Sequence, residues 1–181
     1  LSGLGFISPQ LTTVDTCGYY NWSVVAYDGA DYGNYSSLFN FSIQSYIDIF
    51  LTQNLSDFGN MQIFDTNDTV DNNPLPFMVQ SDSNVYVNVS TRALDELWTT
   101  SGLGNNSFRF KAANSTEVGS FNDTFSQMTY VPVFSSNRLA IHRLNFHNST
   151  DTAEIDLEVT VPGEEPPGQK SSILIVEGAQ S

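Results

Sequence analysis

The chain has 181 residues, 40% of them hydrophobic and 13% aromatic, a composition that predicts a folded protein with a core of its own. Twenty acidic residues stand against six basic ones, giving a formal net charge of -14, and the six cations are too scattered to form a phosphate-binding stripe. Nucleic acid and anionic membrane surfaces are therefore not expected as partners.

Cysteine content and hydropathy exclude two further classes. The single cysteine, Cys17, cannot form an intramolecular disulfide, so it is either a small apolar residue near a turn or half of an intermolecular bridge. No stretch reaches the roughly 18 apolar residues of a membrane span, and no signal peptide is present, so a secreted form of this chain is expected to be mature or trimmed.

The first clear strand pattern covers residues 18–43. It predicts two strands joined by a loop that contains Asp28-Gly29 and Tyr32-Gly33. A Tyr-x-Trp-x-Val-x-Ala strand, an Asp-Gly turn and a closing aromatic strand follow one another, and this order resembles the last two strands of a fibronectin type III or similar immunoglobulin-like domain.

Residues 1–44 are thus predicted to be an N-terminal extension with a β-hairpin, and residues 45–181 a main domain. An isolated two-stranded hairpin is marginal in water. We therefore expect this hairpin to dock on the main domain, to complete a sheet in another chain, or to be the remnant of a longer protein.

Short strand patterns separated by turn signals fill the rest of the chain. They predict an all-β protein, an antiparallel β-sandwich of the jelly-roll or immunoglobulin-like kind. Residues 92–98 have helix-favouring side chains and predict one or two helical turns. Residues 130–134 carry Pro132, which lacks an N–H, so this strand is expected at a sheet edge.

The last two strands are predicted at residues 153–161 and 173–176. The first alternates strictly, which predicts a buried face and a wet acidic face with Glu154, Asp156 and Glu158. The second is apolar throughout, as in a strand covered on both faces. We expect one cover to be the chain's own core and the other the hairpin, from this subunit or the next.

These considerations select a set of predicted subunit-contact residues. They lie on the apolar sides of the hairpin and in the apolar final strand: Tyr20, Trp22, Val24, Phe39, Phe41, Ile43, Ile173, Leu174, Ile175 and Val176.

Asparagines point to an extracellular location. Ten Asn-x-Ser/Thr sequons occur where roughly three or four are expected by chance. Several fall on the polar side of an alternating strand, where a glycan would not touch the core. The predicted N-glycosylation sites are Asn21, Asn34, Asn40, Asn54, Asn67, Asn88, Asn105, Asn114, Asn122 and Asn148.

No catalytic motif is found. His142 and His147 are not arranged as zinc ligands, and no Gly-x-Ser-x-Gly elbow occurs, so the chain is not predicted to be an enzyme. Oxygen ligands gather in one polar loop, which makes calcium the only cofactor considered, although the spacing is not that of an EF-hand. The candidate ligands are Asp65, Asn67, Asp68 and Asp71.

Four runs carry a second resemblance: SDFGNM at residues 56–61, DNNPLPFMVQSDSNVYVNVS at 71–90, FRFKA at 108–112 and AEIDLEVTVPGEEPPGQKSS at 153–172. They resemble secreted archaeal β-sandwich proteins that are filament or envelope components. The general plan is also similar to camelysin-like biofilm-fibre subunits. That similarity implies a sandwich completed by a strand from the neighbouring molecule.

Two functions are expected from these features. The first is a structural subunit of an extracellular, glycosylated cell-surface filament whose copies polymerise by strand exchange or β-augmentation. The alternative is the terminal domain of an adhesin or S-layer-type envelope protein that binds a glycan or another cell through exposed aromatics such as Trp22, Tyr35 or Trp98.

Overall fold

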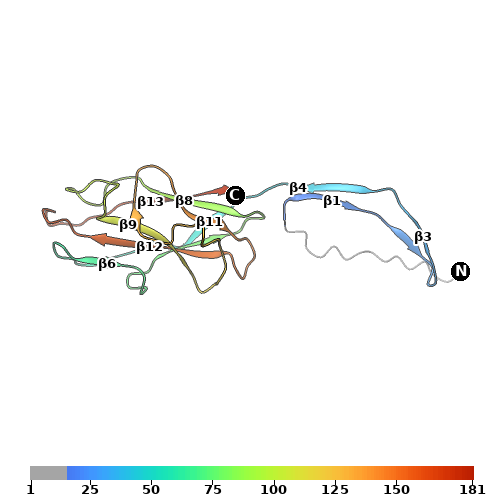
Figure 1. Cartoon of the computed structure of the whole chain (residues 1–181), viewed down its shortest axis with the longest axis horizontal. Helices are drawn as coiled ribbons and strands as arrows, with labels where there is room; N and C mark the ends of the chain where they lie inside the picture. The colour runs from blue at the N-terminus through green and yellow to red at the C-terminus, as the bar shows by residue number, and fades with distance from the viewer. Residues whose placement is uncertain (1–15) are drawn as a thin grey trace. The chain divides into compact units, whose positions relative to one another are not determined.

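The computed structural model describes residues 16–181, which contain 13 β-strands and no helix (Figure 1). All strand pairs are antiparallel. Contacts divide the chain into two units, which are described separately: Leu1–Tyr46, of which residues 16–46 are described, and Ile47–Ser181. The predicted all-β class is confirmed.

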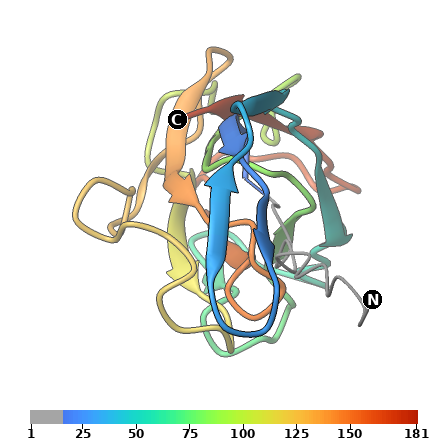
Figure 2. The same cartoon turned by 90° about the vertical axis from the view of Figure 1, so that its right-hand side faces the viewer.

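The first unit is one long hairpin whose two arms are each interrupted once. β1 (Gly18–Trp22) pairs with β4 (Phe39–Ile43), and β2 (Val25–Tyr27) pairs with β3 (Tyr32–Tyr35), as the blue ribbons of Figure 2 show. The Asp28 carboxylate closes the turn by accepting the backbone N–H groups of the second and third residues after it, each at 2.9 Å. The predicted hairpin with Asp28 and Gly29 in its turn is confirmed, but Tyr32 and Gly33, predicted in the loop, belong to β3.

The second unit is a sandwich of two sheets. The larger sheet has the strand order β10-β9-β12-β7-β5, and β6 also pairs with β12. Its strands are β5 (Ile49–Gln53), β6 (Thr66–Asp68), β7 (Phe77–Ser81), β9 (Phe108–Asn114), β10 (Val131–Pro132) and β12 (Thr152–Thr160). The smaller sheet has the order β11-β8-β13 and consists of β8 (Val87–Ala93), β11 (Arg138–Leu144) and β13 (Leu174–Gln180).

Alternating side chains of the two sheets form the core between them. Val87 and Val89 of β8 face Ile155 and Leu157 of β12 across one continuous cluster, and Phe110 of β9 is fully buried in it. Each large apolar side chain buried in this way stabilises the fold by about 1.5–3 kcal/mol. The period-two alternation along these strands therefore determines which side chains form the core.

One side of the sandwich is closed by main-chain bonds. The N–H of Ala112 in β9 donates to the carbonyl of Gln127, whose own N–H donates to the carbonyl of Ala140 in β11. β10, which carries Pro132, ends the larger sheet on this side and pairs only with β9 among the described strands, so its predicted edge position is confirmed.

The helical turns predicted at residues 92–98 are absent from the described structure. Arg92 and Ala93 continue β8 instead. The N–H of Ala93 donates to the carbonyl of Phe134, and that of Leu94 to the carbonyl of Ile173, both distant in sequence. The helix prediction was wrong because long-range sheet pairing outweighs a helix propensity worth only tenths of a kcal/mol per residue.

The wet acidic face predicted for β12 is also wrong in part. Asp156 is 2% exposed, and Glu154 and Glu158 are half-buried, because β12 is a central strand with neighbours on both sides. Asp156 accepts a hydrogen bond from Thr69 Oγ1 at 2.8 Å, and its other oxygen lies 3.5 Å from Lys111 Nζ. Burial raises the pKa of Glu154, and the charge of Asp156 raises it further.

Candidate functional site

The hairpin of the first unit presents stacked aromatic pairs. The rings of Trp22 and Phe39 stack at 4.8 Å between centroids, and those of Tyr20 and Phe41 at 5.3 Å. Trp22, Phe39 and Phe41 are nevertheless exposed within the described part of the chain. Stacking fixes the rings on one face of the ribbon and leaves them open to a partner.

Val24 and Ile43, the remaining hairpin residues predicted to contact a neighbour, are half-buried. The other large exposed hydrophobic side chains of this unit are Leu38 and four tyrosines: Tyr19, Tyr32, Tyr35 and Tyr46. The hairpin therefore offers aromatic surface on both arms.

β13 is an edge strand of the smaller sheet. The N–H of Leu94 donates to the carbonyl of Ile173, and the N–H of Ser181 donates to the carbonyl of Tyr86. The odd-numbered residues of β13 therefore direct their N–H and C=O groups toward β8. In an antiparallel ladder the intervening residues then direct their N–H and C=O groups outward. Within residues 16–181, no strand pairs with this outer side.

The side chains of β13 divide between two faces. Leu174 and Val176 pack against the core, whereas Ile173 lies on the other face and is 57% exposed. Ile175, on the same outer face, is half-buried. The described structure thus supplies one of the two covers expected for this apolar run.

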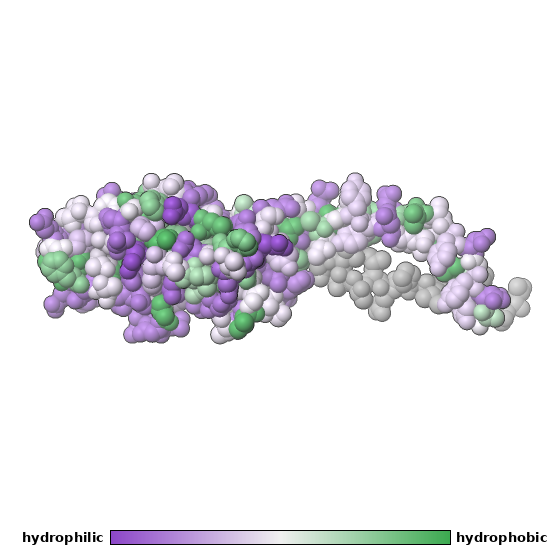
Figure 3. Space-filling view, in the orientation of Figure 1, coloured by the Kyte–Doolittle hydropathy of each residue, from purple (hydrophilic) through white to green (hydrophobic). Residues whose placement is uncertain are grey.

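The distribution of hydrophobic residues on the second unit indicates that a partner would bind at a sheet edge and not on a sheet face. On the side seen in Figure 3, hydrophobic and hydrophilic residues are interspersed and no large hydrophobic area forms. An edge strand is recognised mainly through its peptide groups and does not require such an area.

The ten predicted glycosylation sites all lie at the surface. Six are exposed and four are half-buried. Asn88 shows how the pleat places them, because its neighbours Val87 and Val89 are fully buried while Asn88 is on the opposite face of β8. Its Oδ1 accepts the N–H of Arg143 at 3.0 Å.

The predicted calcium ligands are engaged in local turns. Asp65 accepts the N–H of Gln62, Asp68 that of Val70, and Asp71 that of Asn73, at 2.7 to 3.0 Å. In residues 16–181, no three His, Cys, Asp or Glu side chains gather as a metal-binding group. The structure therefore adds no support to the calcium prediction.

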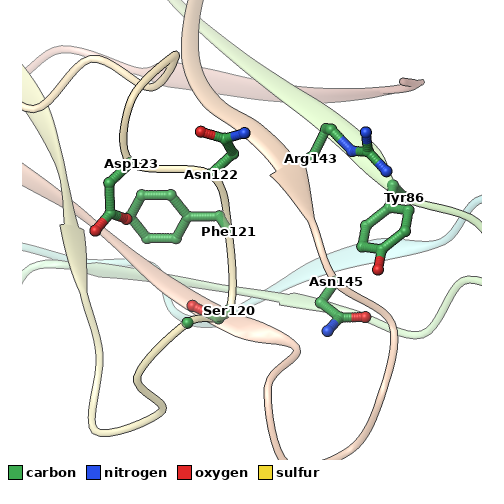
Figure 4. A pocket seen from close by; sticks show the side chains of 8 residues that line it. Tyr86, Ser120, Phe121, Asn122, Asp123, Arg143 and Asn145 are labelled. Atoms are coloured by element: carbon green, nitrogen blue, oxygen red, sulfur yellow. The ribbon is translucent and has the colours of Figure 1, made fainter.

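A shallow polar hollow of about 440 Å³ lies open to solvent on the second unit. Three separate segments surround it, as Figure 4 shows, and its lining consists of Tyr86, Gly119, Ser120, Phe121, Asn122, Asp123, Arg143 and Asn145.

The backbone of β11 is reshaped at this hollow. The register between β11 and β8 shifts between Ile141 and Leu144, and Arg143 has a φ of 57°, a left-handed conformation that is rare for a residue with a side chain. The Arg143 guanidinium carbon lies 4.5 Å from the centroid of the Tyr86 ring. Bulges commonly re-aim a side chain, and Figure 4 shows that of Arg143 extending toward Tyr86 at the edge of the hollow.

Arg143 is also distinguished electrostatically. Four of the six cationic residues form ion pairs with carboxylates: Arg92, Arg109, Lys111 and Lys170. Arg138 lies over the ring of Phe134 at 4.7 Å. Arg143 forms no ion pair within the described residues, in a chain whose net charge is -14. Its donors remain available to an external acceptor.

One residue that lines the hollow, Ser120, has an unsatisfied hydroxyl. Ser120 is fully buried, and its Oγ has no hydrogen-bond partner in the part of the chain that the structure describes. More than 90% of buried polar groups are paired, so this hydroxyl is unusual, but its complete burial keeps it out of contact with a molecule in the hollow.

Sequence reasoning did not find this hollow. Asn122 was selected only as a sequon, and Tyr86, Ser120 and Arg143 belong to no motif. One signal was available, since Arg143 interrupts the apolar alternation of residues 139–144, but alternation alone cannot reveal which segments meet.

Two further residues fall outside their expected roles. Trp98, expected as an exposed aromatic for ligand binding, is 7% exposed, and its indole N–H donates to the carbonyl of Ser107 at 2.9 Å. That expectation was wrong, because the ring fills the core. Cys17 is half-buried and not in a disulfide.

The comparisons with known proteins add no relative. No family model, no curated protein and no solved structure matches this chain. Among the described residues there is no helix able to span a membrane. Any function assigned to the chain therefore depends on the open edge, the aromatic hairpin and the polar hollow themselves.

Proposed function

We propose that the chain is a structural subunit of an extracellular, glycosylated cell-surface filament, in which one arm of the hairpin of one copy adds to β13 of the next. The observation that carries this proposal is the unpaired outer edge of β13, with its row of outward peptide groups. Natural proteins usually protect such edges, because an open edge is a template for pairing with another strand.

The hairpin is the partner that best fits this edge. Its residues alternate in period two, so main-chain pairing would give affinity and the side chains would set the register. Its exposed Trp22 and Phe39 rings would supply the second cover that Ile173 and Ile175 require. An edge that binds a different element of the next copy makes a head-to-tail contact, and such contacts propagate as open filaments.

The extracellular assignment draws on a separate observation. All ten sequons are at the surface, and none of their asparagines is buried. Glycans at these positions would not disturb the core, and a high density of them is typical of proteins exposed outside the cell.

The test compares three variants of the full chain. Ile175→Lys places a charge at the β13 edge and Trp22→Ser removes a hairpin ring, and both are expected to reduce polymer mass in light scattering and abolish fibres in electron micrographs. Leu139→Lys, an exposed apolar residue on β11 at the other edge of the same sheet, is the matched control and should assemble normally. A wild-type chain that stays monomeric, or three variants that behave alike, would refute the proposal.

A second function, the terminal domain of an adhesin or envelope protein, is favoured by the highly exposed tyrosines of the hairpin. Tyr19, Tyr32 and Tyr35 would then form a platform for a sugar or another cell surface. The two functions differ in the effect of Tyr35→Ser. A binding platform loses its ligand on a glycan array, whereas filament growth through β13 is unaffected.

A further inference from the structure

We propose that the hollow beside Arg143 holds the first sugars of an N-linked glycan on Asn122. The inference rests on the proposed glycosylated, extracellular state and deepens it, because it names one sequon and the side chains that receive its sugar. Its occupant is the chain's own modification, attached at the rim of the hollow.

The backbone around Asn122 is held firmly. Its N–H donates to the carbonyl of His142 at 2.9 Å, and its carbonyl accepts the N–H of Ser126 at 3.1 Å. Its side-chain Oδ1 accepts the N–H of Thr124 at 3.1 Å. Nδ2, the atom that carries an N-linked glycan, makes no hydrogen bond to the described residues, so the asparagine is oriented while its reactive atom remains available.

Asn122 lines the same hollow as Arg143, Tyr86 and Asn145, and Figure 4 shows its side chain and that of Arg143 on either side of the β11 ribbon. A sugar attached there would have the guanidinium of Arg143 within the same hollow. The bulge, the left-handed backbone and the bond to Asn88 Oδ1 all maintain that orientation of Arg143.

The chemistry of the lining suits a sugar. Each ring carries several hydroxyl, amide or carboxyl oxygens, which accept hydrogen bonds from a guanidinium. The carboxylate of Asp123, which also lines the hollow, accepts hydrogen bonds from hydroxyl groups. Donors and acceptors are thus both present in one hollow of about 440 Å³.

The covalent step is ordinary N-glycosylation. Nδ2 of Asn122 bonds to the anomeric carbon of the first sugar and loses one proton. The bond between that carbon and the phosphate of a lipid-linked oligosaccharide donor breaks, and the lipid phosphate leaves. The Thr124 hydroxyl, third in the sequon, completes the recognition signal.

Asn114 provides a matched control within the same protein. It also opens a sequon, which Ser115 and Thr116 complete, and it is exposed at the end of β9 and outside the lining of the hollow. A glycan on Asn114 would be attached outside the hollow that Arg143 lines.

The test is a double-mutant cycle on the full chain made in a host that N-glycosylates, with occupancy of each sequon measured by glycopeptide mass spectrometry. Thr124→Ala removes the Asn122 sequon but keeps the asparagine, and Arg143→Gln removes the guanidinium. Arg143→Gln should lower the unfolding midpoint by about 3 °C when Asn122 carries its glycan, and by less than half as much in the Thr124→Ala background.

The control cycle replaces Thr124→Ala by Thr116→Ala, which should leave the effect of Arg143→Gln unchanged. A glycosidase should also release the Asn122 glycan more slowly than the Asn114 glycan, and Arg143→Gln should remove the difference. An unglycosylated Asn122 beside occupied sequons, or equal Arg143→Gln effects in both backgrounds, overturns the inference and leaves the proposed function standing. If instead the chain forms no filaments but Arg143→Gln still costs more in the Asn122-glycosylated background, the filament function is refuted and the inference about the hollow stands.

Discussion

Asp151 is a buried carboxylate with an oxygen that has no hydrogen-bond partner among the described residues. The residue is 3% exposed, and the oxygen in question is Oδ1. Burial raises the pKa of this side chain, and the nearby charge of Glu117 raises it further, although a hydrogen bond from Gln80 opposes both. Its backbone carbonyl, by contrast, is well used, since it accepts the N–H of Ser81 at 3.0 Å.

Asp151→Asn is therefore expected to stabilise the protein at pH 7 by about 1 kcal/mol. Because the folded state binds the proton more tightly than the unfolded state, wild-type stability falls as pH rises from about 3.9, the ordinary Asp value, through the raised pKa. The advantage of the variant should vanish below about pH 4. Urea unfolding of both proteins at a series of pH values measures this stability difference. An Asp151→Asn variant less stable than the wild type at pH 7 would contradict the prediction.

At the scale of strands, β9 and β12 are joined by a ladder of opposite charges. Their register places Lys111 opposite Asp156 and Arg109 opposite Glu158. Arg109 Nε donates to Glu158 Oε1 at 2.7 Å. Asp156 is the buried member of the set, so its ion pair is far less screened by water than an exposed one.

Lys111→Met should destabilise the fold by about 2 kcal/mol, because it leaves the Asp156 carboxylate buried with Thr69 as its remaining partner. Adding Asp156→Asn should restore most of that loss, since the amide can still accept from Thr69. Arg92→Met, which breaks the exposed pair with Glu177, is the control and should cost less than about 0.5 kcal/mol. Equal losses for Lys111→Met and Arg92→Met in urea unfolding would contradict the argument.

At the scale of the whole molecule, charge opposes self-association. With 20 acidic and six basic residues, copies of the chain repel one another before any edge can pair. The same repulsion disfavours non-specific aggregation through the open β13 edge.

Filament growth should therefore accelerate with salt. Raising ionic strength from about 0.01 M to about 1 M shortens the screening length from roughly 30 Å to roughly 3 Å, which removes most of the repulsion between copies. Light scattering at constant protein concentration should show growth at least tenfold faster at the higher ionic strength. Growth that slows with salt would indicate an interface held by opposite charges instead of β-augmentation.

Particular elements show why parts of this structure were predictable. The hairpin around Asp28, the strands of the core and the edge position of Pro132 depend on local chemistry: a turn carboxylate, period-two alternation and a missing N–H. Residues 92–98 were misassigned because their amides bond to Phe134 and Ile173, which lie outside any local window. The burial of Asp156 was missed for the same reason, since alternation does not tell a central strand from an edge strand.

By itself, then, the sequence determined an acidic, all-β chain with ten surface sequons and an apolar final strand, because alternation, turn residues and composition act locally. Only the tertiary structure decided that β13 is an open edge and that Tyr86, Asn122 and Arg143 meet at one hollow. The open edge depends on strand order, and the hollow depends on a bulge in β11. Strand order follows from long-range packing that no short stretch of sequence specifies.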